Sequence, residues 1–437
     1  MKKLIGSKIM SLVDELHENG ATCYVVGGYV RDFLLKKDAY DIDLEVHNID
    51  VKQLEKILVK HSMFELQGNF GIYILKDIKN VEISIPRKES SIGIKHDDFE
   101  INLDPFMGTK EASKRRDFTV NALMYNLKTN QIIDEHNGLD DLKNNILRHV
   151  SDKFIEDDLR VFRAVRFASQ LGFSIDKNTI KLCKTMDVNN VSNNRKADEF
   201  KKFMLGKYVY ETLDLFKEIL GDKYGLGDLH KVEQNYLYHP EGNAWLHTKE
   251  ALRIGVLIFS KFDIETKFIG LTSLLFHDIG KICKIKDSNI EHEILSLDMF
   301  DGFSEQLINN KKHIKLIQKC IKYHMEPREI KTMDGEFIFE LLTTFDNNLE
   351  LFLNVCAADI CCRYDVYEKD EVLKSIEKYH QNITKRFLDI YSFYKQIMLK
   401  YNGLYFMELG FSGNEIKVQQ KELFVQLIDG FNKDWKI

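Results

Sequence analysis

The stretch VVGGYVRDFLLKKDAYDIDLEV, residues 25–46, decides the fold of the N-terminal part of the chain. An apolar run ends in Gly27 and Gly28, and Arg31 follows three residues later. Because glycine has no side chain, backbone N–H groups there can approach a phosphate, and an arginine can add charge-assisted hydrogen bonds. The pattern predicts a strand, a tight turn and a helix that together can bind a polyphosphate.

Two carboxylates close the same stretch, where Asp41 and Asp43 are separated by one residue. On a strand, two such residues point to the same face. Adjacent carboxylates repel each other unless a cation lies between them, so a buried pair is typical of a divalent metal site. A DxD pair alone is more often a solvated strand edge. The glycines and the arginine before it favour metal-dependent nucleotidyl transfer instead.

Composition restricts the class of protein. A chain of 437 residues is too long for one ordinary core, and 44% hydrophobic with 30% charged residues is typical of a soluble globular protein of two to four domains. No run of eighteen apolar residues occurs, so we expect no membrane span. Seven scattered cysteines without a CxxC pair indicate a cytoplasmic protein. The net charge of −6 argues against indiscriminate coating of nucleic acid but allows a local basic surface.

The hydrophobic pattern changes along the chain. Five short β-rich runs are expected as strands, at residues 22–28, 41–46, 71–76, 81–86 and 132–138. From about residue 151 a period of 3.6 dominates, which predicts helices to the end. The fold class is therefore α+β, a mixed head followed by helical parts. The predicted parts are a head (1–150), a helical neck (151–215), a helical body (216–375) and a helical tail (376–437).

A second charged motif lies in EDDLRVFRAVRFASQLGF, residues 156–173. Asp157, Arg160, Arg163 and Arg166 recur every three residues, so consecutive members would be neighbours on a helix. The simple alternative is an exposed charged helix with an ion pair of little energetic value.

An aspartate beside an arginine can distinguish nucleobases. A carboxylate only accepts hydrogen bonds and a guanidinium only donates them. Cytosine and adenine present an amine donor beside a ring-nitrogen acceptor, whereas guanine and uracil present the reverse order. Asp157 and Arg160 could therefore accept CTP and ATP and reject GTP and UTP, because the wrong base leaves buried polar groups unpaired.

A third group of polar residues is spread over the helical body. Its members are histidines and aspartates in separate helical segments, namely His247, His277, Asp278, His292, His324 and Asp359. Imidazole and carboxylate ligands in this number can hold one or two divalent ions and leave positions open for a phosphate and a water. The alternative is a helical scaffold in which these residues are satisfied structurally.

The motifs taken together resemble a known family. GGYVRD followed by DID, RRDFTVNAL at residues 115–123 and EDDLR at 156–160 resemble the bacterial class II tRNA nucleotidyltransferases, the CCA-adding enzymes, and their poly(A) polymerase relatives. FHDIGK at residues 276–281, with HPEGNAWLHT before it, resembles the HD phosphohydrolase superfamily. The resemblance implies a polymerase-β-like nucleotidyltransferase head with a mixed sheet, an all-α neck, an HD body and a tail.

The resemblance also implies roles and partners. The partners would be tRNA, CTP and ATP, with Mg²⁺ in the head and a divalent metal in the HD domain. Asp41 and Asp43 would hold Mg²⁺ and act catalytically. Nucleotide contacts would come from Gly28, Arg31, Arg116, Asp157, Arg160, Arg163 and Arg166. The metal of the HD domain would be held by the six histidines and aspartates named above, and that domain would hydrolyse phosphomonoesters and 2′,3′-cyclic phosphates.

Several interpretations stay open at this point. Residues 86–105 resemble the flexible loop of the terminal adenosine step, or form a plain β-hairpin. Arg195 and Glu199 are expected to be structural, and residues 404–424 to form a helical hairpin. The chain could instead be a poly(A) polymerase, or an enzyme that adds only CC or only A. From another class, it could be an HD phosphohydrolase with an RNA-binding head.

Overall fold

The computed structural model divides the chain into two compact units, 1–195 and 196–437, each of which is described by itself. Within them, the structure describes residues 5–38, 41–61, 63–65, 71–75, 80–91, 99–284, 290–326, 333–363 and 369–434. The first unit combines sheets and helices and the second is helical, so the predicted α+β class is confirmed. The finer division into head, neck, body and tail stays a prediction.

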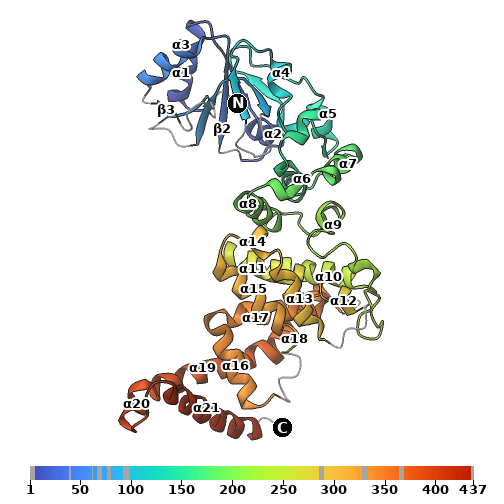
Figure 1. Cartoon of the computed structure of the whole chain (residues 1–437), viewed down its shortest axis with the longest axis vertical. Coiled ribbons are helices and arrows are strands. Elements are labelled where there is room, and N and C mark those ends of the chain that lie inside the picture. The colour runs from blue at the N-terminus through green and yellow to red at the C-terminus, as the bar shows by residue number, and fades with distance from the viewer. Residues whose placement is uncertain are drawn as a thin grey trace. The chain divides into compact units, whose positions relative to one another are not determined.

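A seven-stranded mixed sheet forms the centre of the first unit, with strand order β3-β4-β5-β2-β1-β8-β9 (Figure 1). Its strands are β1 (Thr22–Val26), β2 (Ile42–His47), β3 (Met63–Glu65), β4 (Ile72–Leu75), β5 (Val81–Ser84), β8 (Met124–Asn126) and β9 (Ile132–Ile133). Strands β2 and β5 are parallel, and the other neighbours are antiparallel. All five predicted strands are therefore present, whereas β3 and β8 were not predicted.

Residues 86–105 contain a separate pair of antiparallel strands. Strand β6 (Arg87–Ser91) pairs with β7 (Phe99–Leu103), so that Arg87 lies opposite Leu103. The hairpin interpretation thus holds for the strands, while residues 92–98 between them lie outside the described residues.

Helices complete the first unit around its sheet. They are α1 (Ser7–Glu18), α2 (Gly28–Leu34), α3 (Val51–Lys60), α4 (Thr109–Ser113), α5 (Gly138–Lys143), α6 (Leu159–Leu171) and α7 (Lys177–Thr185). Helix α1 packs against β1 and α3. It buries Ile9, Leu12 and Leu16, whose spacing places them on one face of the helix. Short strands β10 (Ile146–Leu147) and β11 (Ser174–Ile175) pair in parallel.

The second unit is built from helices, after α8 (Asn193–Met204), which begins at the end of the first unit. These helices are α9 (Leu213–Leu220), α10 (Ala244–Ile258), α11 (Ile264–Phe276), α12 (Lys281–Lys284), α13 (His292–Asp301), α14 (Ser304–Leu307), α15 (Lys311–Tyr323), α16 (Gly335–Phe345), α17 (Leu349–Cys361), α18 (Lys369–Tyr379), α19 (Lys385–Lys400), α20 (Gly403–Glu408) and α21 (Asn414–Asp434). Helices α10, α11 and α17 pack against one another and form its centre. In the part of the chain that the structure describes, no helix has both the length and the apolar surface to cross a bilayer.

Aromatic packing supports this helical unit. Phe203 and Phe216 stack with ring centroids 4.7 Å apart, and Phe200 and Phe276 extend the cluster towards α11. All four rings are fully buried, and side chains of this size contribute strongly to a core. The predicted C-terminal hairpin is also present, since α20 packs against α21.

An ion pair joins Asp117 to α6 in the first unit. Asp117 is buried, and its Oδ2 accepts a hydrogen bond from Nε of Arg163 at 2.8 Å. Its Oδ1 accepts from the backbone N–H of Phe118 at 2.8 Å and from Nδ2 of Asn121 at 3.0 Å. Burial alone would raise the pKa of Asp117, but the charge of Arg163 and these hydrogen bonds lower it to about 2.

We predict that Asp117→Asn lowers the free energy of unfolding by about 3 kcal/mol at neutral pH, because it removes the buried negative charge that faces the guanidinium of Arg163. The pKa of Asp117 is lower in the folded than in the unfolded chain, where it is about 3.9. Its contribution is therefore fully present above about pH 4 and is lost as the pH falls towards about 2. Urea denaturation at several pH values checks this.

The control for that experiment is Asp140→Asn, at an exposed position on α5. It should change the free energy of unfolding little at any pH. A difference between the wild type and Asp117→Asn that stays constant from neutral pH to about pH 2 would contradict the prediction.

Candidate functional site

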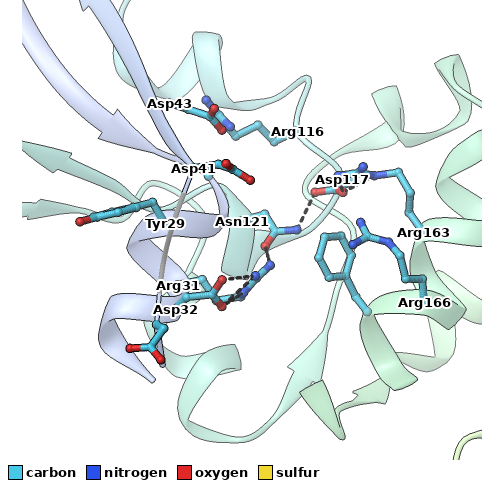
Figure 2. Close-up of a pocket in the computed structure, with 14 residues that line it drawn as sticks. Tyr29, Arg31, Asp32, Asp41, Asp43, Arg116, Asp117, Asn121, Arg163 and Arg166 are labelled. Carbon is cyan, nitrogen blue, oxygen red and sulfur yellow. Dashed lines mark hydrogen bonds and ion pairs between the residues drawn. The ribbon is translucent and has the colours of Figure 1, made fainter. Parts of the chain in front are cut away.

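A cavity of about 380 Å³ lies in the first unit, where the β1–α2 turn, the start of β2, the segment after α4 and helix α6 meet (Figure 2). It is lined by Gly27, Gly28, Tyr29, Arg31, Asp32, Asp38, Asp41, Asp43, Arg116, Asp117, Asn121, Arg163, Arg166 and Phe167. Seven of the nine head and neck residues predicted from sequence are in this set. The structure therefore brings the turn, the paired carboxylates and part of the neck motif together.

The turn from β1 into α2 depends on glycine at one position. Gly27 has φ +73, a backbone conformation that other residues rarely adopt. A Cβ there would lie 3.1 Å from Oδ2 of Asp43 and 3.3 Å from Nη1 of Arg116. At Gly28 the nearest atom would be 3.5 Å away, which is ordinary contact. Gly27, more than the predicted Gly28, is thus the position that lets the carboxylate and the guanidinium approach the turn.

The paired carboxylates lie at the start of β2. Asp41 precedes the strand and is exposed, while Asp43 is half-buried within it. Burial raises the pKa of Asp43 to about 6; the charge of Arg116 opposes this shift, and Glu82 and Asp41 add to it. Glu82 is the residue of β5 that pairs in register with Asp43. A half-buried carboxylate among other carboxylates is an oxygen-rich setting that suits a divalent cation.

Behind the cavity wall, strand β2 continues with two polar residues that sequence reasoning missed. Oε2 of Glu45 lies 3.3 Å from Nη2 of Arg116 and 3.5 Å from Nη2 of Arg115. Oε1 of Glu45 lies 3.0 Å from Nε2 of His47. Burial would raise the pKa of Glu45, but the hydrogen bond with His47 and the two arginines lower it to about 2. Glu45 and His47 follow Asp43 by two and four residues, and this even spacing was the signal for both, because it puts them on the same strand face.

A chain of hydrogen bonds connects α2 with α6. Nη1 of Arg31 donates to Oδ1 of Asn121 at 2.6 Å, and Nδ2 of Asn121 donates to Asp117, which pairs with Arg163 (Figure 2). Arg31 also binds the carboxylate of Asp32 through two hydrogen bonds of 2.8 Å. Asp117 and Asn121 lie in the RRDFTVNAL motif, yet no role was predicted for either.

Three guanidinium groups surround the ring of Phe167. The centroid of this ring lies 3.7 Å from Cζ of Arg166, 5.0 Å from that of Arg31 and 5.3 Å from that of Arg163. The face of an aromatic ring attracts cations, so Phe167 offsets part of the repulsion among the arginines. It also keeps their side chains beside the cavity, where they can contact an anion.

Asp157 and Arg160 are not found among the described residues that line this cavity. Asp157 precedes α6, which begins at Leu159, and its Oδ2 accepts from Nη2 of Arg195 at 3.1 Å. Arg160 donates to the backbone carbonyls of Lys153, at 2.6 Å, and of Arg115. The predicted pairing of these two side chains on one base stays a prediction, and Asp157 also accepts a hydrogen bond from the backbone N–H of Leu159 at 3.1 Å.

A second cluster lies in the helical unit and contains all six predicted residues. His247 is on α10, His277 and Asp278 follow α11, His292 begins α13, His324 follows α15 and Asp359 is on α17. Nε2 of His247 lies 2.9 Å from Oδ1 of Asp359, 3.3 Å from Nε2 of His277 and 3.5 Å from Oδ2 of Asp278. Oδ1 of Asp278 lies 3.1 Å from Nε2 of His292 and 3.8 Å from that of His324. The four histidines thus surround Asp278, and Asp359 joins the cluster through His247.

The outer ring nitrogens of this cluster have partners of their own. Nδ1 of His277 bonds the carbonyl of Leu274 at 2.8 Å, and Nδ1 of His324 bonds that of Ile321 at 2.7 Å. This arrangement directs both Nε2 atoms inward, as in histidines that ligate metals. Nδ1 of His247 contacts Glu241, a residue that sequence reasoning did not assign.

The chemistry of the second cluster fits a divalent cation. Burial, with His277 nearby, holds the pKa of His324 well below its usual range, which keeps the imidazole neutral as a ligand must be. Burial would raise the pKa of Asp278, but the charges of His277 and Lys281 hold it well below its usual range. Inward imidazole nitrogens around ionised carboxylates are ligands that zinc, iron and manganese sites use.

Known proteins similar in sequence to this chain include members of one group. Residues 23–148 match the family model of the poly(A) polymerase head domain. A multifunctional CCA protein of Haemophilus ducreyi is 28% identical over 365 residues, which cover 78% of this chain and 85% of that protein. One from Stenotrophomonas maltophilia is 26% identical over 393 residues, 84% of this chain and 93% of that protein.

Solved structures share the fold. A Thermotoga maritima CCA-adding enzyme complexed with tRNA has a TM-score of 0.61 at 19% identity and covers 98% of this chain and 92% of that one. A CCA-adding enzyme in complex with ATP has a TM-score of 0.60 at 20% identity, with 97% and 90% covered. A nucleotidyltransferase head of this kind implies dependence on a divalent metal. The chain is therefore similar to multifunctional CCA proteins over most of its length, has the fold of CCA-adding enzymes, and matches the poly(A) polymerase head-domain model at residues 23–148.

Proposed function

We propose that this protein adds the CCA sequence to the 3′ ends of tRNA, using CTP and ATP. One observation carries the proposal: the paired carboxylates Asp41 and Asp43 share a cavity with Arg31, Arg116, Arg163 and Arg166. Carboxylates that can hold metal ions beside several guanidinium groups suit transfer of a nucleotidyl group from a triphosphate. The relatives named multifunctional CCA proteins and the CCA-adding enzyme solved with tRNA support tRNA as the acceptor.

In this proposal each group of residues has a separate task. Asp41 and Asp43 hold Mg²⁺ ions, which lower the pKa of the attacking 3′-hydroxyl and stabilise the leaving pyrophosphate when bound. Arg31 and Arg116 bind phosphate oxygens, and the Gly27–Gly28 turn lets backbone N–H groups approach them. The side chains thereby fix the α-phosphate in line with the attacking oxygen.

The base would be chosen by protein side chains in the neck. Asp157 accepts the exocyclic amine of cytosine or adenine, and Arg160 donates to the ring nitrogen beside it. Arg195 supports this role, since its hydrogen bond to Asp157 orients the carboxylate. Arg163 and Arg166, which line the cavity, contact the rest of the nucleotide.

Two related activities differ from this proposal in their products. A poly(A) polymerase would extend many RNAs with AMP alone, and a CC-adding enzyme would stop before the terminal A. The relatives that align over most of the chain are named CCA proteins, which favours complete CCA addition. The histidine and aspartate cluster, which a poly(A) polymerase does not need, points in the same direction.

The second cluster supports a second activity. We propose that it binds a divalent cation through His247, His277, Asp278, His292, His324 and Asp359 and hydrolyses phosphomonoesters or 2′,3′-cyclic phosphates. Burial would lower the pKa of His247, but Cys362, Asp359 and Glu241 around it raise the pKa well above its usual range. The same acidic surroundings favour positive charge, which a divalent cation would supply in place of the imidazole proton.

The first test offers tRNAs that lack the last three, two or one nucleotides together with one nucleoside triphosphate at a time. We expect CMP addition to the first two, AMP addition to the third, and neither GMP nor UMP addition. Asp41→Ala and Asp43→Ala should each abolish addition, because the cavity then lacks a metal ligand. Asp140→Asn, outside the cavity, is the matched control. Processive AMP addition to unrelated RNA would overturn the proposal.

A second test concerns the base. Asp157→Ala should reduce the preference for CTP and ATP over GTP and UTP by about tenfold or more, because no carboxylate then accepts a hydrogen bond from the exocyclic amine. The ratio of kcat/KM values for the four nucleotides measures this. Arg195→Ala separates the contribution of Arg195 from that of Asp157, since it removes their hydrogen bond and keeps the carboxylate. Asp152→Ala, at an exposed position, is the neutral control. An unchanged ratio in Asp157→Ala would remove Asp157 from base selection.

A third test concerns the second cluster. The double variant His277→Ala and Asp278→Ala should abolish release of phosphate from 2′,3′-cyclic nucleotides and phosphomonoesters while nucleotide addition continues. Asp228→Ala with His230→Ala, both exposed, is the matched control. Equal loss of both activities in the first variant would show that the cluster has a structural role.

A further inference from the structure

The carboxylate of Glu45 is a buried charge that the proposed reaction does not use. Glu45 is 1% exposed and lies outside the set of described residues that line the cavity. A buried carboxylate is costly unless it is paired, and this one contacts three positively charged or donor groups, on Arg115, Arg116 and His47. Such an arrangement on the strand that carries Asp43 requires an explanation.

We propose that Glu45 and His47 are positioning residues for nucleotidyl transfer, which hold the guanidinium of Arg116 against the Gly27 turn and prevent it from neutralising Asp43. The inference rests on the proposed function. It adds residues that touch neither the nucleotide nor the acceptor and that act through Arg116.

The geometry of Arg116 gives the first step. Its Nη2 lies 3.3 Å from Oε2 of Glu45, a residue that is not among the described residues lining the cavity. Its Nη1 lies 3.3 Å from the point that a Cβ on Gly27 would occupy. One end of the planar guanidinium is thus bound by Glu45, and the other is presented at the turn where backbone N–H groups meet phosphate. A planar fork fixed at one end loses less rotational freedom when the other end binds an anion.

His47 gives the second step, because it fixes Glu45. Its Nε2 faces Oε1 of Glu45 at 3.0 Å, and its Nδ1 faces the backbone carbonyl of Met107 at 3.0 Å. The edge of its ring packs against Tyr24, with centroids 5.0 Å apart. The imidazole therefore ties one carboxylate oxygen to the segment after β7 and leaves Oε2 for the two arginines.

Competition between carboxylates gives the third step. A Cβ on Gly27 would lie 3.1 Å from Oδ2 of Asp43 and 3.3 Å from Nη1 of Arg116, so both side chains reach the same point beside the turn. An arginine that turned towards Asp43 would occupy a carboxylate that the proposed reaction needs for metal. Because Glu45 offers a desolvated partner two residues further along the same strand face, it holds Nη2 of Arg116 and shares the charge of the guanidinium.

The test compares the wild type with Glu45→Gln, which keeps the size of the side chain and removes its charge. With saturating tRNA, we expect KM for CTP and ATP to rise about tenfold with kcat changed much less, because ground-state binding of the triphosphate is weakened. The Mg²⁺ concentration for half-maximal rate should rise as well. Thermal unfolding verifies that the variant folds, and His47→Gln provides a second variant that should shift both quantities in the same direction.

Two controls make the result specific. Asp141→Asn removes another buried carboxylate, one that binds Arg148 and Thr119 outside the cavity lining, and should leave KM unchanged. In an Arg116→Ala background, Glu45→Gln should raise KM no further, since its effect passes through that arginine. Equal KM values in the wild type and both single variants, or fully additive effects in the double variant, would overturn the inference. A wild type that adds no nucleotide would overturn the proposed function instead.

Discussion

The first unit depends on one constraint: several guanidinium groups must lie close together. Arg31, Arg116, Arg163 and Arg166 all reach one cavity of about 380 Å³. Like charges at such distances repel each other, so each requires a partner in the protein. The structure provides acidic, amide and aromatic partners in turn, and these partners connect the glycine turn, the middle strand of the sheet and helix α6.

These partners explain why the local elements depend on one another. Asn121 accepts from Arg31 and donates to Asp117, and Asp117 accepts from Arg163, so the helix that follows the glycine turn is connected with α6 through three hydrogen bonds. Phe167 lies against three of the four guanidinium groups. A change in any one of these side chains alters the surroundings of the others, which is the behaviour expected of a network and not of independent contacts.

Much of this could be predicted from the sequence because the signals are local. The glycines, Asp41 and Asp43 lie within one strand-turn-helix-strand segment, and the period of the hydrophobic pattern gave the strands and the helices. Contacts between distant segments could not be predicted in the same way. Asp157 contacts Arg195, 38 residues away, and the sequence does not show which distant side chain a carboxylate will meet. Glu45 and His47 were missed for a different reason, since their strand spacing was visible but their burial was not.

In the second cluster, too, some features could be predicted from the sequence and others could not. Its six residues were recognised by their types and order, although they lie on separate helices between residues 247 and 359. The inward direction of the imidazoles comes from carbonyls such as that of Leu274, which the sequence does not identify. Ligand identity was thus predictable, whereas the support that orients the ligands was not.

The charges that line the first cavity have a thermodynamic consequence. Its described lining contains four arginines and five aspartates, so the fully ionised wall carries one negative charge in excess. A free triphosphate, which is strongly anionic, would gain little from such a wall. A complex of the triphosphate with divalent cations would reverse the balance. Metal and nucleotide should therefore bind with positive coupling, each raising the affinity for the other, and the wall would select the metal complex over the bare nucleotide.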